Sequence, residues 1–158
     1  MLPSDHRWPV DGHVHFHSLS RVAPTLDAAD GHFRAAAGQS EGLLGALLLT
    51  QTSGEFVYES LVAQSSVGAW TLRAAPEEEE SLIASRDRVA IAIVCGRQVR
   101  AADGLEVLGL GTCEPFVDGL PVADAVSLVR RSGAVTVLPW GFGKWLGERG
   151  RRVERLLE

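Results

Sequence analysis

Histidine is scarce in this chain and is missing from most of it. Only five of the 158 residues are histidine, and none follows Phe33. Three of the five alternate within the segment "VDGHVHFHSLS", at His13, His15 and His17. A site built on these side chains must therefore be completed, over the rest of the chain, by groups other than imidazole.

Other absences exclude whole classes of protein. No stretch reaches the roughly 18 consecutive apolar residues of a membrane-spanning helix, so no membrane association is expected. The opening segment "MLPSDHRWPVDGH" has no apolar core of the kind found in a signal peptide. With 15 basic and 20 acidic residues the net charge is -5, which argues against nucleic-acid binding. Cys95 and Cys113 lack metal-type spacing, so a reduced, cytoplasmic protein is expected, with a disulfide between them left open.

The composition that is present is ordinary for a globular protein, with 46% hydrophobic and 22% charged residues. The length suits a single domain over residues 1–158, and no internal repeat or low-complexity linker divides it. A complete eight-fold βα barrel takes about 250 residues, so a chain of this length could hold only part of one.

Short apolar runs alternate with helix-like segments along the chain. Strands are predicted at residues 10–17, 45–50, 68–74, 88–99, 104–111 and 134–140. Helices are predicted at residues 25–38, 53–64, 118–133 and 144–158, with a further short one beginning in the acidic run 77–80. Asp103-Gly104 marks a tight turn. This alternation predicts an α/β protein with a mainly parallel, helix-covered sheet or barrel.

The alternating histidines are typical of a metal-binding strand. His13 and His15 project from one face of the predicted strand, and neutral imidazole is the commonest protein ligand for zinc and similar ions. Asp11, on the same face, could bind the metal or orient a histidine ring. His17 is either a third ligand or a solvated side chain.

The segment "VDGHVHFH" resembles the opening motif of the PHP (polymerase and histidinol phosphatase) family, which is similar in style to the amidohydrolases. The resemblance implies a distorted βα barrel that binds two or three divalent metals and, in many members, hydrolyses phosphoesters. It extends loosely over "GALLLTQTSG", "AIAIVCGRQV", "GLEVLGLG" and "PVADAVSLVRRSGAVTVLPW".

Several positions depart from the family pattern. Thr50-Gln51-Thr52 stands where the family has Thr-Asp-His, Gln98 replaces a bridging glutamate, Glu106 replaces a histidine, and the histidine of a His-Pro motif is missing beside Trp140. Glutamine brings no charge to a metal. The remaining ligands are then expected among Asp11, His17, Glu106 and Glu114, or outside this chain. Glu114, which follows a predicted strand, could equally be a turn residue.

A second candidate stretch is "PWGFGKWLGERG". It follows a predicted strand and leads into a helix, where α/β folds place ligand sites. Its glycines allow close backbone approach, and Lys144 and Arg149 offer positive charge to an anion. The alternative is a glycine-rich turn with solvated basic side chains.

Two functions follow from these patterns. The first is a divalent-metal-dependent hydrolase of the phosphoesterase or amidohydrolase type, using zinc, manganese or iron on a small anionic substrate, of which a phosphorylated compound is one example. In it, Lys144 and Arg149 hold the substrate. The second is a catalytically degenerate PHP-like module that binds a ligand or assembles without metal. Open sheet edges would also allow a homo-oligomer of truncated barrels.

Overall fold

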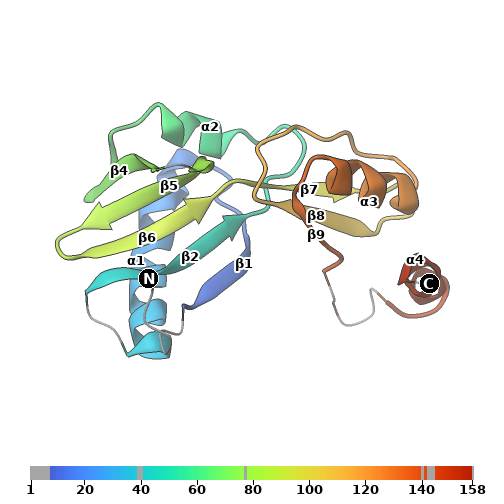
Figure 1. The fold of residues 1–158 in the computed structure, drawn as a ribbon, viewed down its shortest axis with the longest axis horizontal. Helices are drawn as coiled ribbons and strands as arrows, with labels where there is room; N and C mark the ends of the chain where they lie inside the picture. Colours follow the sequence, from blue (N-terminus) through green and yellow to red (C-terminus); the bar gives the residue numbers. More distant parts are fainter. Residues whose placement is uncertain (1–7, 39–40, 77, 140, 142–144, 158) are drawn as a thin grey trace.

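The chain folds into two β-sheets joined end to end, each covered by helix (Figure 1). A computed structural model describes residues 8–38, 41–76, 78–139, 141 and 145–157. No helix among these residues is long and apolar enough to cross a membrane.

The larger sheet is mixed. Within the described residues it has six strands, in the order β1-β2-β6-β5-β4-β3. Their bounds are β1 Val10–Val14, β2 Gly42–Leu49, β3 Ser66–Val67, β4 Trp70–Ala75, β5 Glu78–Arg86 and β6 Val89–Val94. The first three in spatial order, β1, β2 and β6, run parallel, whereas β5, β4 and β3 pair antiparallel. The parallel strands therefore end at a common edge.

Two helices pack against this sheet, α1 (Leu19–Ala37) and α2 (Val57–Val62). The long α1 crosses the sheet and lies behind it in Figure 1. Its buried side chains recur with helical spacing, and they join the apolar side chains of β2 and β6 in one core. Its almost completely buried members include Val22, Leu26, Leu44, Leu49, Leu61, Trp70, Ile91 and Ile93.

The smaller sheet is antiparallel and has its own core. It consists of β7 (Gly96–Arg100), β8 (Glu106–Leu110) and β9 (Val135–Val137) in that order. The amphipathic α3 (Val122–Arg131) packs on β8, and α4 (Glu148–Leu157) lies beyond β9 (Figure 1). The second core contains Val99, Val107, Ala125, Val129 and Val153.

A continuous stretch of chain joins the two sheets. β6 passes through the fully buried Cys95 into β7, and Gln51 forms a parallel bridge with Arg97 of β7. Backbones approach very closely here: a Cβ added at Gly96 would lie 2.1 Å from the carbonyl oxygen of Leu49. Only glycine fits this position without moving the strand.

The predicted βα barrel is wrong. Within the part of the chain that the structure describes, three strands of the larger sheet run parallel, the smaller sheet is antiparallel, and the sheets do not close into a barrel. The reason lies in the connections. β4 and β5, and β5 and β6, are each separated by two residues, and links that short can join only antiparallel neighbours. Helices separate only some of the strands, so the α/β alternation predicted from the sequence breaks down after β3, where β4, β5 and β6 follow without a helix.

Three local predictions also need correction. The short helix predicted to begin in the acidic run 77–80 is wrong: residues 78–80 belong to strand β5, whose residues pair with β4 on one side and β6 on the other. The strand predicted at 134–140 shortens to β9 and is not buried, since Val135 is 65% exposed. The helix predicted from Thr25 begins at Leu19 and accommodates Pro24 in its second turn. The Asp103-Gly104 turn is confirmed between β7 and β8.

Candidate metal centre

The histidine cluster lies where the parallel strands of the larger sheet end. β1 carries His13 and leads directly to His15 and His17, β2 leads to Thr50, and β6 continues towards Gln98. The carboxyl ends of parallel strands are the usual location of ligand sites in open sheets, because the loops that leave them converge.

The strand predicted at residues 10–17 ends at Val14, and Val10, expected on the buried face, is 55% exposed, but the predicted alternation holds from His13 to His17. Val14 and Phe16 point into the core, with 7% and 2% exposure, and the three histidines point away from it. At the end of this run His17 adopts a positive φ of 54°, unusual for a residue other than glycine. The turn is closed by a hydrogen bond from the amide of Ser18 to the carbonyl of Phe16. Such a turn stores backbone strain, which proteins retain mostly at functional positions.

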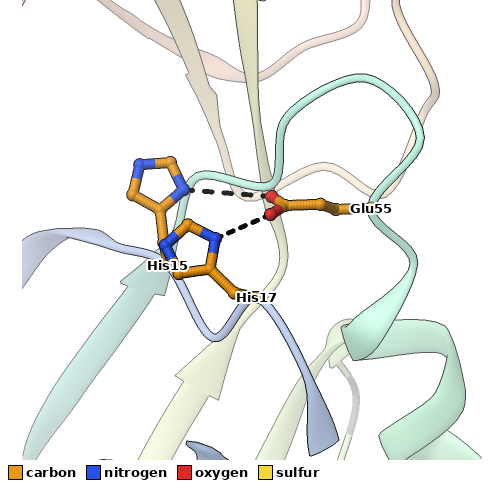
Figure 2. Close-up of side chains that lie close together, drawn as sticks. All are labelled: His15, His17 and Glu55. Atoms are coloured by element: carbon orange, nitrogen blue, oxygen red, sulfur yellow. Dashed lines mark hydrogen bonds and ion pairs between the residues drawn. The ribbon is translucent and has the colours of Figure 1, made fainter.

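His15, His17 and Glu55 form a group that could hold a metal ion (Figure 2). Their ligand atoms all lie within 4.8 Å of one another. His17 Nδ1 lies 2.8 Å from Glu55 Oε1, and His15 Nδ1 lies 3.9 Å from Glu55 Oε2. The two rings stack with centroids 5.2 Å apart and planes inclined by only 4°. Both Nδ1 atoms therefore face the same carboxylate.

The two nitrogens of His15 differ in their surroundings. Nε2 lies 3.3 Å from Thr50 Oγ1 and 3.2 Å from His13 Nε2. Nδ1 is buried and has no hydrogen-bond partner in the part of the chain that the structure describes. A buried polar atom without a partner costs about 1–3 kcal/mol. Burial, and then the neighbouring His13, lower the pKa of His15. Its ring is therefore neutral at pH 7, and one ring nitrogen has a lone pair available to a metal ion.

Glu55 is held in place by its own turn. The backbone amide of Thr52 donates to Glu55 Oε2 at 2.8 Å, and the amide of Glu55 donates back to the carbonyl of Thr52 at 3.0 Å. Gly54, with φ of 87°, supplies the left-handed residue that this turn needs. Although partial burial opposes its ionisation, hydrogen bonds from Thr52 and His17 leave the pKa of Glu55 below its usual value. The carboxylate is thus charged and preorganised.

His13 lies next to this group but faces another partner. Its Nε2 atom lies 3.2 Å from Gln98 Oε1 and the same distance from His15 Nε2. Gln98, at the middle of β7, therefore lies beside the histidines although it is 85 positions away from His13 in the sequence. It contributes a neutral amide oxygen there.

The other acidic candidates lie around the group rather than in it. Asp11 accepts a hydrogen bond from the amide of His13 at 3.2 Å. Glu106, which stands opposite Arg100 in the backbone register of the β7–β8 hairpin, is near enough to His15 to act on it electrostatically. The amide of Glu114 bonds to Thr112 Oγ1, and its side chain is not part of the ligand group.

Of the two basic loop candidates, the structure places only Arg149, and it lies away from the histidines. Lys144 lies outside the described residues. Arg149, in α4, lies against the turn of the β7–β8 hairpin: a Cβ at Gly104 would be 3.1 Å from its Nη2 atom. The histidines, in contrast, contact the middle of β7.

A different arginine borders a cleft beside the histidines. The cleft has a volume of about 200 Å³ and is lined by Thr52, Ser53, Gln98, Arg100 and Asp118. Two of the lining residues connect the cleft to the histidine cluster: Gln98 contacts His13, and the backbone amide of Thr52 donates to Glu55. Arg100 makes no ion pair with any residue that the structure describes. A free guanidinium at a polar cleft is suited to an anionic group.

Sequence reasoning missed Glu55 and Arg100. Glu55 lies in the loop after β2, one of the loops expected to converge on the site once β1 and β2 are taken as parallel neighbours. That rule could have identified it. Arg100 follows Gln98 by two residues and lies on the same exposed face of β7. Strand alternation could therefore have identified Arg100 as a neighbour of Gln98.

Comparisons with known proteins leave the site to be interpreted from its geometry alone. No family model matches the chain, and neither the curated proteins nor the solved structures include a significant match.

Proposed function

We propose that this chain binds a divalent transition metal at His15, His17 and Glu55 and uses it to hydrolyse a small anionic ester. One observation carries the proposal: His15 Nδ1 is buried without a hydrogen-bond partner among the described residues, 3.9 Å from a carboxylate oxygen of Glu55. An ion between these two atoms would satisfy both. Ligands bound to one ion at about 2.1 Å lie about 3–4 Å apart, so little movement is needed.

The donor set suits zinc, iron or manganese. Two neutral imidazoles and one carboxylate are the protein ligands of many catalytic zinc sites and of non-haem iron sites. Three protein ligands leave a coordination position open for water. Thr50 Oγ1, which lies 3.3 Å from His15 Nε2, would fix the tautomer that presents Nδ1 to the metal.

The metal would supply the chemistry, and this chain's residues would position the substrate. A bound divalent ion lowers the pKa of a water ligand and polarises an ester oxygen. Arg100, at the neighbouring cleft, would hold the negative group of the substrate, and the hydroxyls of Thr52 and Ser53 could donate hydrogen bonds to it. A phosphoester is the simplest substrate of this kind. The carboxylate of Asp118, which also lines the cleft, offsets part of the positive charge that Arg100 brings to it.

Metal analysis of the purified protein tests the proposal first. We expect close to one equivalent of zinc, iron or manganese, lost when His15→Ala and His17→Ala are combined. His32→Ala is the matched control, because His32 lies on α1 outside the cluster. Metal retained in full by the double variant would contradict the proposed site.

Hydrolysis is the second test. With added zinc, manganese or iron, the protein should hydrolyse p-nitrophenyl phosphate above the rate of the double variant. A protein that binds metal without such turnover, towards phosphate, carboxylate or lactone esters, would not be a hydrolase. One that binds no metal would fit the alternative of a non-catalytic ligand-binding or assembly module.

A further inference from the structure

The two cysteines of the chain meet at the junction of the two sheets. Cys95 joins β6 to β7 and is fully buried, and Cys113, in the loop after β8, is partly exposed. The carbonyl of Cys95 accepts hydrogen bonds from the amides of Gly111 and Thr112, at 2.9 and 3.2 Å, which brings the Cys113 backbone alongside. Cys113 also packs on the core cluster that contains Cys95.

Their side chains interact, since a hydrogen bond between the two thiols is the largest influence on the pKa of each. The interaction is unequal. The buried Cys95 keeps its proton and donates it towards Cys113, whose pKa is lowered first by that hydrogen bond. A partly exposed sulfur with more thiolate character is the one that an oxidant attacks first, and a second thiol beside it resolves the product.

The loop that holds Cys113 is connected to the metal-binding group by one buried side chain. Arg97, 5% exposed, donates from Nη2 to the carbonyl of Cys113 at 2.8 Å and from Nη1 to the carbonyl of Glu55 at 2.9 Å. Its charge is balanced by Glu59. Any shift of the Cys113 backbone therefore moves the guanidinium that supports the Glu55 turn.

We propose that Cys95 and Cys113 form a modification site, in which peroxides oxidise the two thiols reversibly to a disulfide. Formation of this disulfide weakens metal binding at Glu55. The second half rests on the proposed function; the first does not. Closing the bond requires the two sulfurs to approach to about 2.05 Å, which draws the Cys113 loop inward and away from its position over Arg97.

The chemistry balances with hydrogen peroxide as the oxidant. The Cys113 sulfur attacks one peroxide oxygen and the O–O bond breaks; the leaving hydroxide takes the proton of the Cys113 thiol and becomes water, which leaves a sulfenic acid on Cys113. The Cys95 sulfur then attacks the Cys113 sulfur and expels hydroxide, which takes the Cys95 proton and leaves as the second water. The two thiols lose two electrons and the peroxide gains them. A dithiol such as dithiothreitol reverses the change.

Peptide mapping tests the disulfide. The metal-free protein is treated with one equivalent of hydrogen peroxide, catalase removes the excess, and remaining thiols are blocked before trypsin digestion. Cys95 falls in the peptide 89–97 and Cys113 in the peptide 101–130. We expect these two peptides to be linked, at a mass about 2 Da below their sum, and separated again by dithiothreitol. Blocked thiols at both positions, or irreversible sulfinic acid on Cys113 alone, would overturn the proposal.

Metal titration tests the coupling. Oxidation should raise the Kd for zinc by about tenfold, the usual effect of disturbing a group that supports a metal ligand. Cys113→Ser, at the partly exposed position, should bind zinc as the reduced protein does and show no response to peroxide. Equal Kd values for the reduced and oxidised proteins would overturn the coupling. A protein that binds zinc in neither state would instead refute the proposed function, and the linked peptide would still decide the thiol chemistry.

Discussion

The carboxylate of Glu55 lies 2.8 Å from Nδ1 of His17 and 3.9 Å from Nδ1 of His15, so one acidic group faces two imidazoles across the end of the parallel strands. Glu55→Gln keeps the shape of this side chain and removes its charge. We expect the Kd for zinc, measured by calorimetry, to rise at least about tenfold, because glutamine is a poor ligand for the metal. Glu41→Gln, an exposed change before β2, is the control. Unchanged zinc affinity in the Glu55 variant would remove the carboxylate from the site.

The three histidines should not contribute equally. His15 and His17 present Nδ1 to Glu55, whereas His13 faces Gln98 at 3.2 Å. We expect His15→Ala and His17→Ala each to weaken zinc binding by about 100-fold or more, and His13→Ala, which only supports His15, by about tenfold. A His13 variant as defective as the His15 variant would instead place the metal between the Nε2 atoms of those two residues, which lie 3.2 Å apart.

Arg100 should govern the binding of anions. It lines the cleft beside Gln98 and makes no ion pair within the described part of the chain. Arg100→Gln removes a charged hydrogen-bond donor, so inorganic phosphate should inhibit the variant about tenfold more weakly than the parent, with the same zinc content. Arg73→Gln, an exposed change on β4, serves as the comparison. Equal inhibition constants for the Arg100 variant and the parent would assign the anion to another group.

Gly96 should be intolerant of a side chain. A Cβ there would lie 2.1 Å from the Leu49 carbonyl oxygen and 3.0 Å from that of Gly109. Gly96→Ala should lower the free energy of unfolding by about 3 kcal/mol or more, measured in urea, because backbone on both sides must move. Gly31→Ala in α1 meets nothing within 4 Å and should raise the free energy by up to about 1 kcal/mol. Similar stabilities for both variants would contradict the close approach at the sheet junction.

Acid should weaken the contact between α1 and the larger sheet. The hydrogen bond from Trp70 Nε1, and then Arg86, lower the pKa of Asp27 below its ordinary value. Since the folded-state pKa is depressed, this stabilisation is complete above the unfolded-state pKa, near about 4, and is lost as the pH falls through the folded-state value.

Asp27→Asn tests this by its pH dependence. The variant should melt at a lower temperature than the parent at pH 7, and the difference should shrink below about pH 4, when Asp27 of the parent becomes protonated. The exposed Asp87→Asn in the β5–β6 turn is the reference. A melting-temperature difference that stayed constant down to acid would show that the charge of Asp27 is not involved.

Much of the local structure could be predicted because it depends on neighbouring residues. Val14 and Phe16 alternate with the histidines, which places the two sets on opposite faces of an extended strand. The apolar run of β2, the stripe of α3 and the Asp103-Gly104 turn are equally local signals, and all three were predicted. The sequence alone also led to the histidines as the start of a candidate site.

The contacts between residues far apart in the sequence could not be predicted from the sequence alone. Glu55 meets His17 across 38 positions of the chain, and Gln98 meets His13 across 85. The order of the strands decides both contacts, and the short links between β4, β5 and β6 turned an expected parallel barrel into a mixed sheet. Alternation determined which way each histidine points. Only the tertiary structure decided which groups the histidines contact, and that Nδ1 of His15 has no hydrogen-bond partner among the described residues. Both depend on how strands distant in the sequence are brought together.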